Sequence, residues 1–582
     1  MFAITIISFL FFTALVAFGT WLIVRKRETT SQDGFFLAGR SLTYPVIAGS
    51  LLLTNLSTEQ MVGLNGSAFK EGMSVMAWEV VAVAALVLMA MWFLPKFLKT
   101  GVTTVPEYLK LRFDGVTGGM CNLIFLLTYI LFLLPIILYT GARGMIDILN
   151  LGPVLGVQSE VTQLYILVTA VAVIGSCYAL FGGLRSCAVS DTLNGIGLLV
   201  GGLLIAWLAF DAISPGSFMQ DVDKFMEAGG SRINSIGAND SEAPFFALFT
   251  GIFLINVFYW CTNQQIIQRT LGAKSLAEGQ KGVLLTGLLK LIGPLYLVIP
   301  GMIAAILYME GKLAIPVDPN TGLAVSDKAY GSLVNMVLPA PLKGFFAAVL
   351  LGAILSSFNS VLNSVCTLFS LNVYRPWINP AADDKKVVKI GQYFGLIVTI
   401  ASIVIAPMLM KAGSIFGYLQ SMNGLTFIPL LAIVFMGMIT KKVPAIAAKI
   451  TLISGIVIIA IGYFVPPFNG LVNEIGQFHF VACVFVLMLA TMAIWGRVAP
   501  MPIPYEEKDA KVTDLTPWKY LTPVSIGLLV IVALIYASFA DFSVFSEGKP
   551  KYPTVQDCQA RQKLNLADLE NKYNAVIGVY AV

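Results

Sequence analysis

Charged residues are scarce in this chain of 582 residues: they make up 12% of it, whereas hydrophobic residues make up 57%. An ordinary soluble domain contains about 25% charged residues. The composition therefore excludes a soluble protein and predicts one that resides in a membrane. The net charge of +5 comes without a basic stripe or an aromatic-basic groove, so nothing indicates that nucleic acid is bound.

Histidine and metal-binding cysteine patterns are also lacking. The chain has one histidine, His479, and seven cysteines that lie mostly within apolar runs and lack the paired spacing of a metal site. A single histidine leaves a His-based proton relay, metal cluster or catalytic triad almost no material to work with. We therefore expect no enzymatic activity, no cofactor and no metal other than a transported sodium ion.

Long apolar runs, by contrast, are abundant. A helix of about 20 apolar residues crosses a hydrocarbon core about 30 Å thick, and such runs recur to residue 541. The sequence predicts an all-α polytopic membrane protein with about fourteen transmembrane helices. We place them at 2–24, 44–68, 73–95, 119–142, 160–181, 188–212, 245–265, 281–308, 342–372, 388–409, 413–439, 443–466, 476–497 and 520–541.

Positive charge indicates how the chain is oriented. Lysine and arginine are concentrated in the loops after odd-numbered spans, and the cluster Arg25, Lys26 and Arg27 follows the first span. Cationic loops stay on the cytoplasmic side during insertion. The first span is too long, and too poor in preceding cations, for a cleaved signal peptide. We expect a multi-pass protein of a bacterial inner membrane with both termini outside.

Polar residues interrupt two of the predicted spans. The second contains TNLSTEQ at 54–60, and the seventh contains NVFYWCTNQQ at 256–265. Non-helical backbone at membrane depth is tolerated only where it lines a cavity or is buried in protein. The two spans are five apart, which is the interval of two inverted five-helix repeats, so the breaks should meet near the midplane and form a substrate site. Alternatively, these groups only bond neighbouring helices.

Ionisable residues inside a bilayer are costly and are functional candidates by default. The candidates here are Glu59, Glu79, Asp191 and Lys290. Glu79 and Lys290 have opposite charges, so they could form a structural pair, or each could hydrogen-bond a neutral polyol. The sequence leaves both interpretations open.

Adjacent hydroxyls in the ninth span indicate a cation site. Ser356 and Ser357 follow Ala353 by one helical turn. A sodium cage needs about five or six oxygen ligands, and a broken helix supplies carbonyls freed from helical hydrogen bonding. The two hydroxyls, the Ala353 carbonyl and the carbonyls of Leu53 and Leu56 could form such a cage. Without a broken partner helix, adjacent serines would usually serve only helix packing.

Four longer motifs enclose these residues, in order along the chain. They are FFLAGRSL and LTNLSTEQMVGLNGSA within 35–68, YALFGGLRS at 178–186, NVFYWCTNQQIIQRTLGAKSLAEGQKG at 256–282 and GAILSSFNSVLNS at 352–364. Together they resemble the sodium/solute symporter family, in its sodium/sugar branch. The resemblance implies alternating access by a core of spans 2–11 built as a 5+5 inverted repeat.

The resemblance also implies a division of the chain and roles for individual residues. The segments would be 1–43, the first helix and its loop; 44–440, the core with repeats 44–212 and 245–440; 441–541, three peripheral helices; and 542–582, a polar tail. Sodium would be held by the same set as above, namely Leu53, Leu56, Ala353, Ser356 and Ser357. Sugar would be bound by Asn55, Gln60, Glu79, Asn256, Lys290 and Gln420, with Tyr259 as an inner gate.

Two features depart from the sodium/sugar pattern. A serine that bonds sugar in a related galactose carrier is replaced here by Ala82, which implies a different sugar preference. Some relatives bind a second sodium ion with an aspartate and further serines. The corresponding set here is Asp191, Asn359 and Ser360, in which one hydroxyl is replaced by an amide, so a second sodium ion stays an open alternative.

We therefore predict a sodium-coupled symporter that imports a small neutral polar solute, a monosaccharide such as glucose or galactose. Its partners would be Na+, this solute and membrane lipid, with no obligate protein partner. Three alternatives stay open: the same cycle with an inositol, an amino acid or an organic acid; a membrane solute sensor; and an ion channel.

Overall fold

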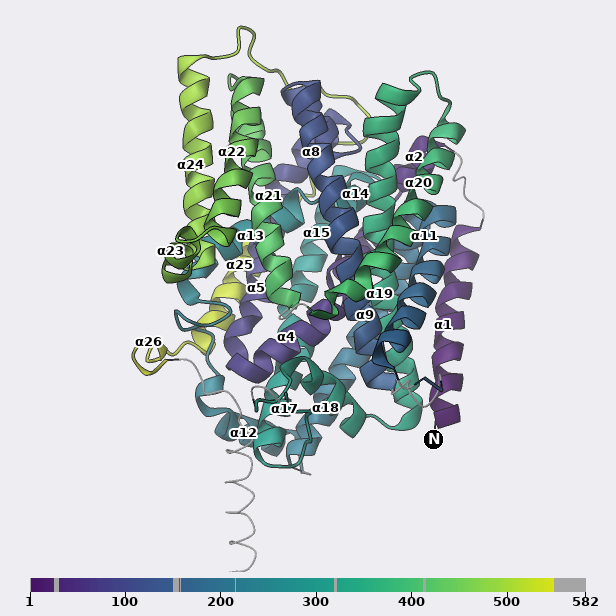
Figure 1. Ribbon diagram of the computed structural model, residues 1–582, viewed down its shortest axis with the longest axis vertical. Coiled ribbons are helices and arrows are strands. Elements are labelled where there is room, and N and C mark those ends of the chain that lie inside the picture. Colours follow the sequence, from purple (N-terminus) through teal and green to yellow (C-terminus); the bar gives the residue numbers. More distant parts are fainter. Residues whose placement is uncertain are drawn as a thin grey trace, which may run out of the picture.

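A computed structural model describes residues 2–25, 31–149, 156–157, 159–214, 216–318, 322–411 and 415–548. Within these ranges the regular elements are helices, and β-structure is limited to isolated bridges. Most of the long helices run along the long axis of the molecule (Figure 1). The predicted all-α membrane fold is confirmed. Most of the predicted polar tail, from residue 549 onward, lies outside the described residues.

The helices follow the predicted spans along the chain. Spans 1–6 correspond to α1 (Phe2–Val24), α3 (Tyr44–Asn55) with α4 (Thr58–Glu71), α5 (Ala77–Leu88), α8 (Gly115–Thr128) with α9 (Leu134–Leu149), and the two parts of α11 (Glu160–Ile213). Spans 7–11 correspond to α13 (Gly251–Cys261), α15 (Leu276–Leu291) with α16 (Gly293–Leu297) and α17 (Ile299–Met309), α19 (Ala340–Phe369), α20 (Asp384–Ile405) and α21 (Ile415–Ile439). Spans 12–14 correspond to α22 (Ala445–Phe464), α24 (Gln477–Val498) and α25 (Leu521–Ser538).

Shorter helices connect these spans. They are α2 (Gln32–Phe36), α6 (Leu94–Thr100), α7 (Val105–Arg112), α12 (Phe218–Gly229), α14 (Gln264–Leu271), α18 (Ala329–Val337), α23 (Phe468–Ile475) and α26 (Val544–Glu547). Side-chain caps begin α7 and α14: the Thr104 hydroxyl accepts a hydrogen bond from an amide of α7, and the Asn263 side chain accepts one from an amide of α14.

The number of spans differs from the prediction at the broken helices. Eleven helices of the described ranges are long and apolar enough to cross a membrane, or twelve if the bent pair of α15 and α16–α17 forms one span. The candidate Gln60–Thr100 joins the end of predicted span 2 to span 3, and the apolar helix Gly251–Cys261 of span 7 is short. The predicted count of about fourteen therefore treats interrupted helices as whole spans.

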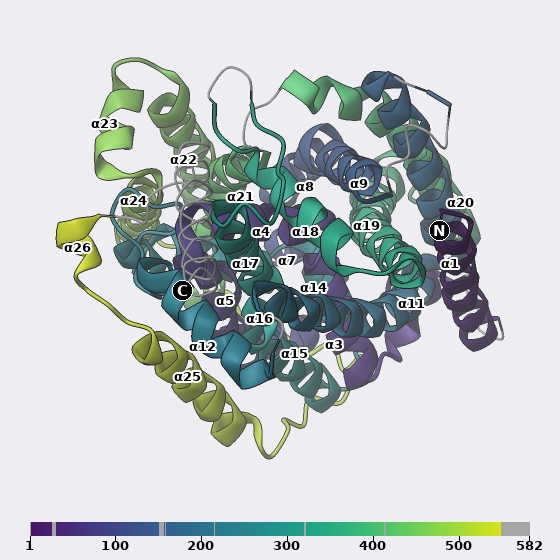
Figure 2. The same ribbon diagram turned by 90° about the horizontal axis from the view of Figure 1, so that it is seen from below.

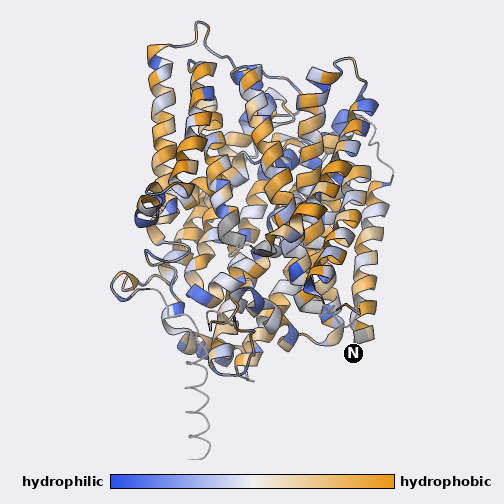
Figure 3. Cartoon of the chain, in the orientation of Figure 1, coloured by the Kyte–Doolittle hydropathy of each residue, from blue (hydrophilic) through white to orange (hydrophobic). Residues whose placement is uncertain are grey.

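Burial separates a central helix from peripheral ones. In the span containing α19, 94% of the apolar window is buried, against 6% for α1 and 11% for α25. α19 packs against α11, α1, α9 and α20, whereas α1 and α25 lie at opposite sides of the bundle (Figure 2). The sides of the molecule are largely hydrophobic (Figure 3), as lipid contact requires. Polar groups on α19 are therefore held inside the protein.

One glycine creates the turn between the predicted fifth and sixth spans. Within α11, Gly183 has φ 59° and ψ −166°, a region that is essentially restricted to glycine. A Cβ atom at this position would lie 2.7 Å from the carbonyl oxygen of Phe35. Gly183 thus lets the chain reverse where α2 crosses it closely.

Replacing Gly183 by alanine should destabilise the protein by about 1–3 kcal/mol or more, because the strained backbone and the Phe35 contact add. Thermal unfolding of the purified protein in one detergent measures this. Gly527→Ala in α25 is the matched control, since a Cβ there meets no atom within 4 Å, and its melting temperature should equal that of the wild type. Equal melting of both variants would contradict the role of Gly183.

Candidate functional site

The second predicted span is broken between α3 and α4. Leu56 and Ser57 leave helical geometry, with ψ angles of 72° and 177°. The Ser57 amide bonds the carbonyl of Asn55 at 2.9 Å, and the Gln60 amide bonds the carbonyl of Ser57 at 3.1 Å. A continuous helix would direct these amides to Leu53 and Leu56, four residues back. The carbonyls of Leu53 and Leu56 thus lose their helical donors, at residues that are fully buried.

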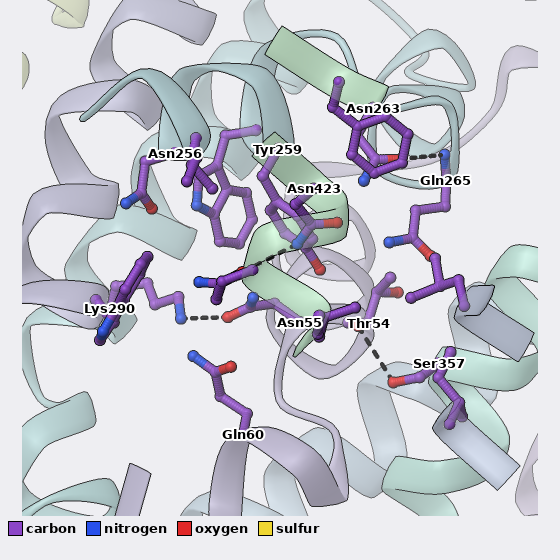
Figure 4. Close-up of a pocket in the computed structure, with 18 residues that line it drawn as sticks. Thr54, Asn55, Gln60, Asn256, Tyr259, Asn263, Gln265, Lys290, Ser357 and Asn423 are labelled. Carbon is purple, nitrogen blue, oxygen red and sulfur yellow. Dashed lines mark hydrogen bonds between the residues drawn. The ribbon is translucent and has the colours of Figure 1, made fainter. Parts of the chain in front are cut away.

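The centre of α19 lies against this break. The Ser357 hydroxyl donates to the carbonyl of Thr54 at 3.2 Å, as Figure 4 shows. The five residues predicted to hold sodium lie on the two segments that this contact joins, and all are buried: Leu53, Leu56, Ala353, Ser356 and Ser357. Carbonyls without helical donors beside two hydroxyls fit the neutral oxygen ligands that a hard monovalent cation requires.

The seventh predicted span is broken between α13 and α14. The Asn263 side chain accepts hydrogen bonds from the Gln265 amide at 3.3 Å and from the Tyr129 hydroxyl. The amides of Thr262 and Asn263 both bond the carbonyl of Phe258. The interruption that the sequence predicted is present. Its backbone amides find hydrogen-bond acceptors within the protein, which a non-helical segment at membrane depth requires.

A cavity lies between the two breaks (Figure 4). Its lining is Thr54, Asn55, Gln60, Trp78, Leu133, Ile137, Ile255, Asn256, Tyr259, Trp260, Asn263, Gln265, Lys290, Ser357, Leu419, Gln420, Asn423 and Phe427. Six of the predicted solute-binding residues are in this lining: Asn55, Gln60, Asn256, Tyr259, Lys290 and Gln420. The seventh, Glu79, is outside this lining and accepts hydrogen bonds from Gln60 and Lys290.

Glu79 and Lys290 form a buried ion pair beside the cavity. The Lys290 Nζ atom lies 2.6 Å from Glu79 Oε2. The side-chain amide of Gln60 donates to Glu79 Oε1 at 2.8 Å. Lys290 also donates to the side-chain oxygen of Asn55. The sequence allowed either a structural pair or separate bonds to a solute, and the pair is present. It joins the cavity side chains of Asn55, Gln60 and Lys290 in one hydrogen-bonded network. The pair brings no net charge to the cavity.

Asn423 and Trp260 are among the lining residues that the sequence reasoning did not predict. Asn423 donates to Gln420 Oε1 at 3.0 Å, and its position three residues after Gln420 on a helix is a signal that could have revealed it. Trp260 packs edge-on against Tyr259 with ring centroids 5.2 Å apart, and its ring lies 5.5 Å from Lys290 Nζ. Nothing in the sequence distinguishes such a tryptophan from a packing residue.

Two of the three residues proposed for a second sodium ion, Asp191 and Ser360, have protein partners. Asp191 Oδ2 lies 3.4 Å from Nη2 of Arg269, and Arg269 also donates to the Ser360 hydroxyl. The Asn359 side-chain oxygen is buried without a hydrogen-bond partner in the described part of the chain. The second sodium ion stays a prediction, and in this conformation an internal cation, Arg269, faces two of its three proposed ligands.

Ala82, which the sequence singled out as a departure from the sodium/sugar pattern, lies outside the site. Ala82 is buried in α5 and is outside the cavity lining given above. The side chain of Glu59 lies outside the part of the chain that the structure describes.

Broken helices around a polar cavity, inside a helical bundle with apolar sides, define a membrane transporter of the inverted-repeat type. The model of the sodium:solute symporter family matches residues 35–455, and the chain therefore belongs to that family. Its members are transporters rather than enzymes, and they couple solute movement to sodium. The predicted family is confirmed.

Individual proteins are similar over most of the chain. An uncharacterised symporter of Escherichia coli K12, YidK, is 44% identical over 93% of this chain and 92% of its own length. A sodium/glucose cotransporter of Vibrio parahaemolyticus is 29% identical over 92% of this chain and 98% of its own length. A solved sodium-coupled sialic acid symporter in an outward-open state aligns with a TM-score of 0.70 over 87% of this chain and 99% of its own, at 18% identity, which supports the fold alone.

Replacing Lys290 by methionine should destabilise the protein by about 3–5 kcal/mol, because Glu79 would be left charged and buried. The double variant Glu79→Gln/Lys290→Met should recover most of this loss. Chemical unfolding in detergent gives the free energies. Lys449→Met is the control, since Lys449 pairs with Asp114 at a partly exposed site and should cost about 0–1 kcal/mol. Equal losses in the Lys290 single and double variants would exclude a role of the ion pair.

Proposed function

We propose that this symporter imports a small neutral polyol, a monosaccharide such as glucose or galactose, together with Na+. The electrically neutral cavity carries this proposal. Glu79 balances the charge of Lys290, and the remaining polar lining consists of amides and hydroxyls, including Gln60, Asn256 and Gln420. Such groups donate and accept hydrogen bonds and so match a ring of hydroxyls.

Charged solutes fit this cavity less well. An organic acid requires an arginine, a lysine or a helix N-terminus to balance its carboxylate. Lys290 is the cationic side chain among the lining residues of the described chain, and Glu79 holds it. A zwitterionic amino acid would have to divide this ion pair. The name of the Vibrio relative, a sodium/glucose cotransporter, supports a sugar, while inositol shares the same hydroxyl chemistry.

Sodium would bind at the junction of the α3–α4 break with α19. Its ligands would be the carbonyls of Leu53, Leu56 and Ala353 and the hydroxyls of Ser356 and Ser357. The support is the loss of helical donors at Leu53 and Leu56 and the contact of Ser357 with Thr54. Since Thr54 and Ser357 also line the cavity, the ion and the solute would share one wall.

This shared wall provides the coupling. Sodium enters first and draws the α3–α4 break toward α19. This fixes the side chains of Asn55 and Gln60, which line the cavity, and sugar then binds more tightly. The linkage is reciprocal, so sugar strengthens sodium binding by the same factor. Tyr259 then closes over the sugar as the inner gate, and one group of helices rocks against the other to open the site inward.

The membrane setting completes the proposal. The chain would lie in a bacterial inner membrane with both termini outside, as the distribution of lysine and arginine supports. Inward movement of each sodium charge through the membrane potential contributes about 2.3 kcal/mol per 100 mV, which drives accumulation.

Uptake into proteoliposomes tests the function directly. Labelled glucose, galactose, myo-inositol, an amino acid and an organic acid are each offered with an inward sodium gradient and with choline in its place. The proposal predicts sodium-dependent accumulation of a monosaccharide. Equal uptake with choline, or sodium-dependent uptake of the organic acid alone, would refute it.

Ser357→Ala should raise the half-saturating sodium concentration by about tenfold or more, because losing one oxygen ligand costs about 1.4 kcal/mol or more. Ser402→Ala is a matched control, since Ser402 is a buried serine of α20 whose hydroxyl bonds its own helix at the carbonyl of Val398. Sodium titration of uptake measures both. A sodium dependence of Ser357→Ala equal to that of Ser402→Ala would argue against the site.

Gln420→Ala should raise the half-saturating sugar concentration by about fivefold to tenfold, the cost of about one hydrogen bond, and leave sodium affinity without sugar unchanged. Gln392→Ala is the control, because Gln392 bonds the carbonyl of Leu180 outside the cavity. Sugar titrations of uptake and sodium titrations of tryptophan fluorescence separate the two affinities. A loss of sodium affinity in Gln420→Ala would assign this residue a structural role instead.

A further inference from the structure

A second buried ion pair joins four helices near the sodium junction. Arg269 of α14 and Asp191 of α11 are at most 1% exposed, with Nη2 and Oδ2 3.4 Å apart. Ser50 of α3 donates to Asp191 at 2.6 Å and accepts from Arg269 Nε at 2.8 Å. Ser360 of α19 accepts from Arg269 Nη2. The guanidinium group thus contacts each of the other three helices through a polar side chain.

The guanidinium group of Arg269 makes more hydrogen bonds than neutralising Asp191 requires. Its third nitrogen, Nη1, donates to the carbonyl of Gln265 at 2.6 Å. All three guanidinium nitrogens are therefore engaged, in a fork that a lysine ammonium could not reproduce. Pairing with Asp191 alone would need only one of these contacts.

The network connects the proposed sodium site to the cavity. On one side, the Ser360 hydroxyl bonds the carbonyl of Ser356 at 2.5 Å and lies 3.1 Å from the Thr54 hydroxyl. Ser356 is a proposed sodium ligand, and Thr54 accepts from Ser357. On the other side, Arg269 donates a hydrogen bond to the backbone carbonyl of Gln265, a residue that lines the cavity. Two hydrogen bonds therefore separate the sodium junction from the half-helix α14.

We infer that Arg269 is a positioning residue that transmits sodium occupancy to α14, the half of the seventh span that follows the break. When sodium draws α3 and α19 together, Ser50 and Ser360 move with these helices, and the guanidinium group carries α14 with them. This sets the position of Gln265 at the cavity wall. The inference rests on the proposed sodium site, and it makes Asp191 the counterion of this connection.

Hydrogen exchange of the full-length protein in nanodiscs tests the inference with sodium chloride alone as the probe and choline chloride as the ionic control. In the wild type, sodium should slow amide exchange both at 53–61 and in α14, in each case by at least about fivefold, the lower end of typical coupling. In Asp191→Asn/Arg269→Gln, which removes both charges together, the slowing at 53–61 should persist and the slowing in α14 should disappear.

Ser360→Ala keeps the ion pair but removes the bridge to α19, and it should reduce the slowing in α14. Arg143→Gln/Glu160→Gln removes an ion pair on the partly exposed surface and should behave as the wild type. If α14 is slowed by sodium equally in the Asp191/Arg269 double variant, the ion pair is only structural and the inference is wrong. If sodium slows no segment of the wild type, the proposed sodium site fails, and the inference fails with it.

Discussion

The requirement that every backbone polar group inside a membrane find a partner governs this structure. Two spans are interrupted, between α3 and α4 and between α13 and α14. Both interruptions are enclosed by the protein, beside α19 and the cavity. At the first break, Leu53 and Leu56 retain carbonyls without helical donors. At the second, Asn263 and Phe258 satisfy the backbone. The two breaks differ in what lies beside them, since the Ser357 hydroxyl of α19 contacts the first break at the carbonyl of Thr54.

Two ion pairs allow charge to remain inside the bundle. Glu79 with Lys290, and Asp191 with Arg269, are each buried and each neutral overall. A buried pair contributes little to stability when compared with apolar residues of the same size, so its retention points to specificity of arrangement. The first pair orients amides toward the cavity, and the second joins the helices beside it. A buried, neutral ion pair thus lies both at the proposed solute site and at the proposed connection between helices.

The sequence predicted the features that follow from local rules. Polar clusters at 54–60 and 256–265 located both helix breaks, and six of the seven proposed solute ligands line one cavity. The partner of Asp191 was missed because the predicted seventh span ended at residue 265, which left Arg269 in a loop, whereas α14 continues as a fully buried helix to Leu271. Trp260 was missed for a different reason, since its role depends on distance from Lys290 and not on any pattern.

The charge balance explains how the proposed cycle draws on the membrane potential. The cavity network is neutral because Lys290 is paired, the connecting network is neutral because Arg269 is paired, and the proposed solute is neutral. The oxygen atoms proposed to bind sodium belong to carbonyls and hydroxyls and carry no formal charge. Sodium therefore supplies the uncompensated charge that moves with the solute in the proposed cycle. Since the potential acts on net charge, about 2.3 kcal/mol per 100 mV is applied to sodium and reaches the solute only through the helices that both contact.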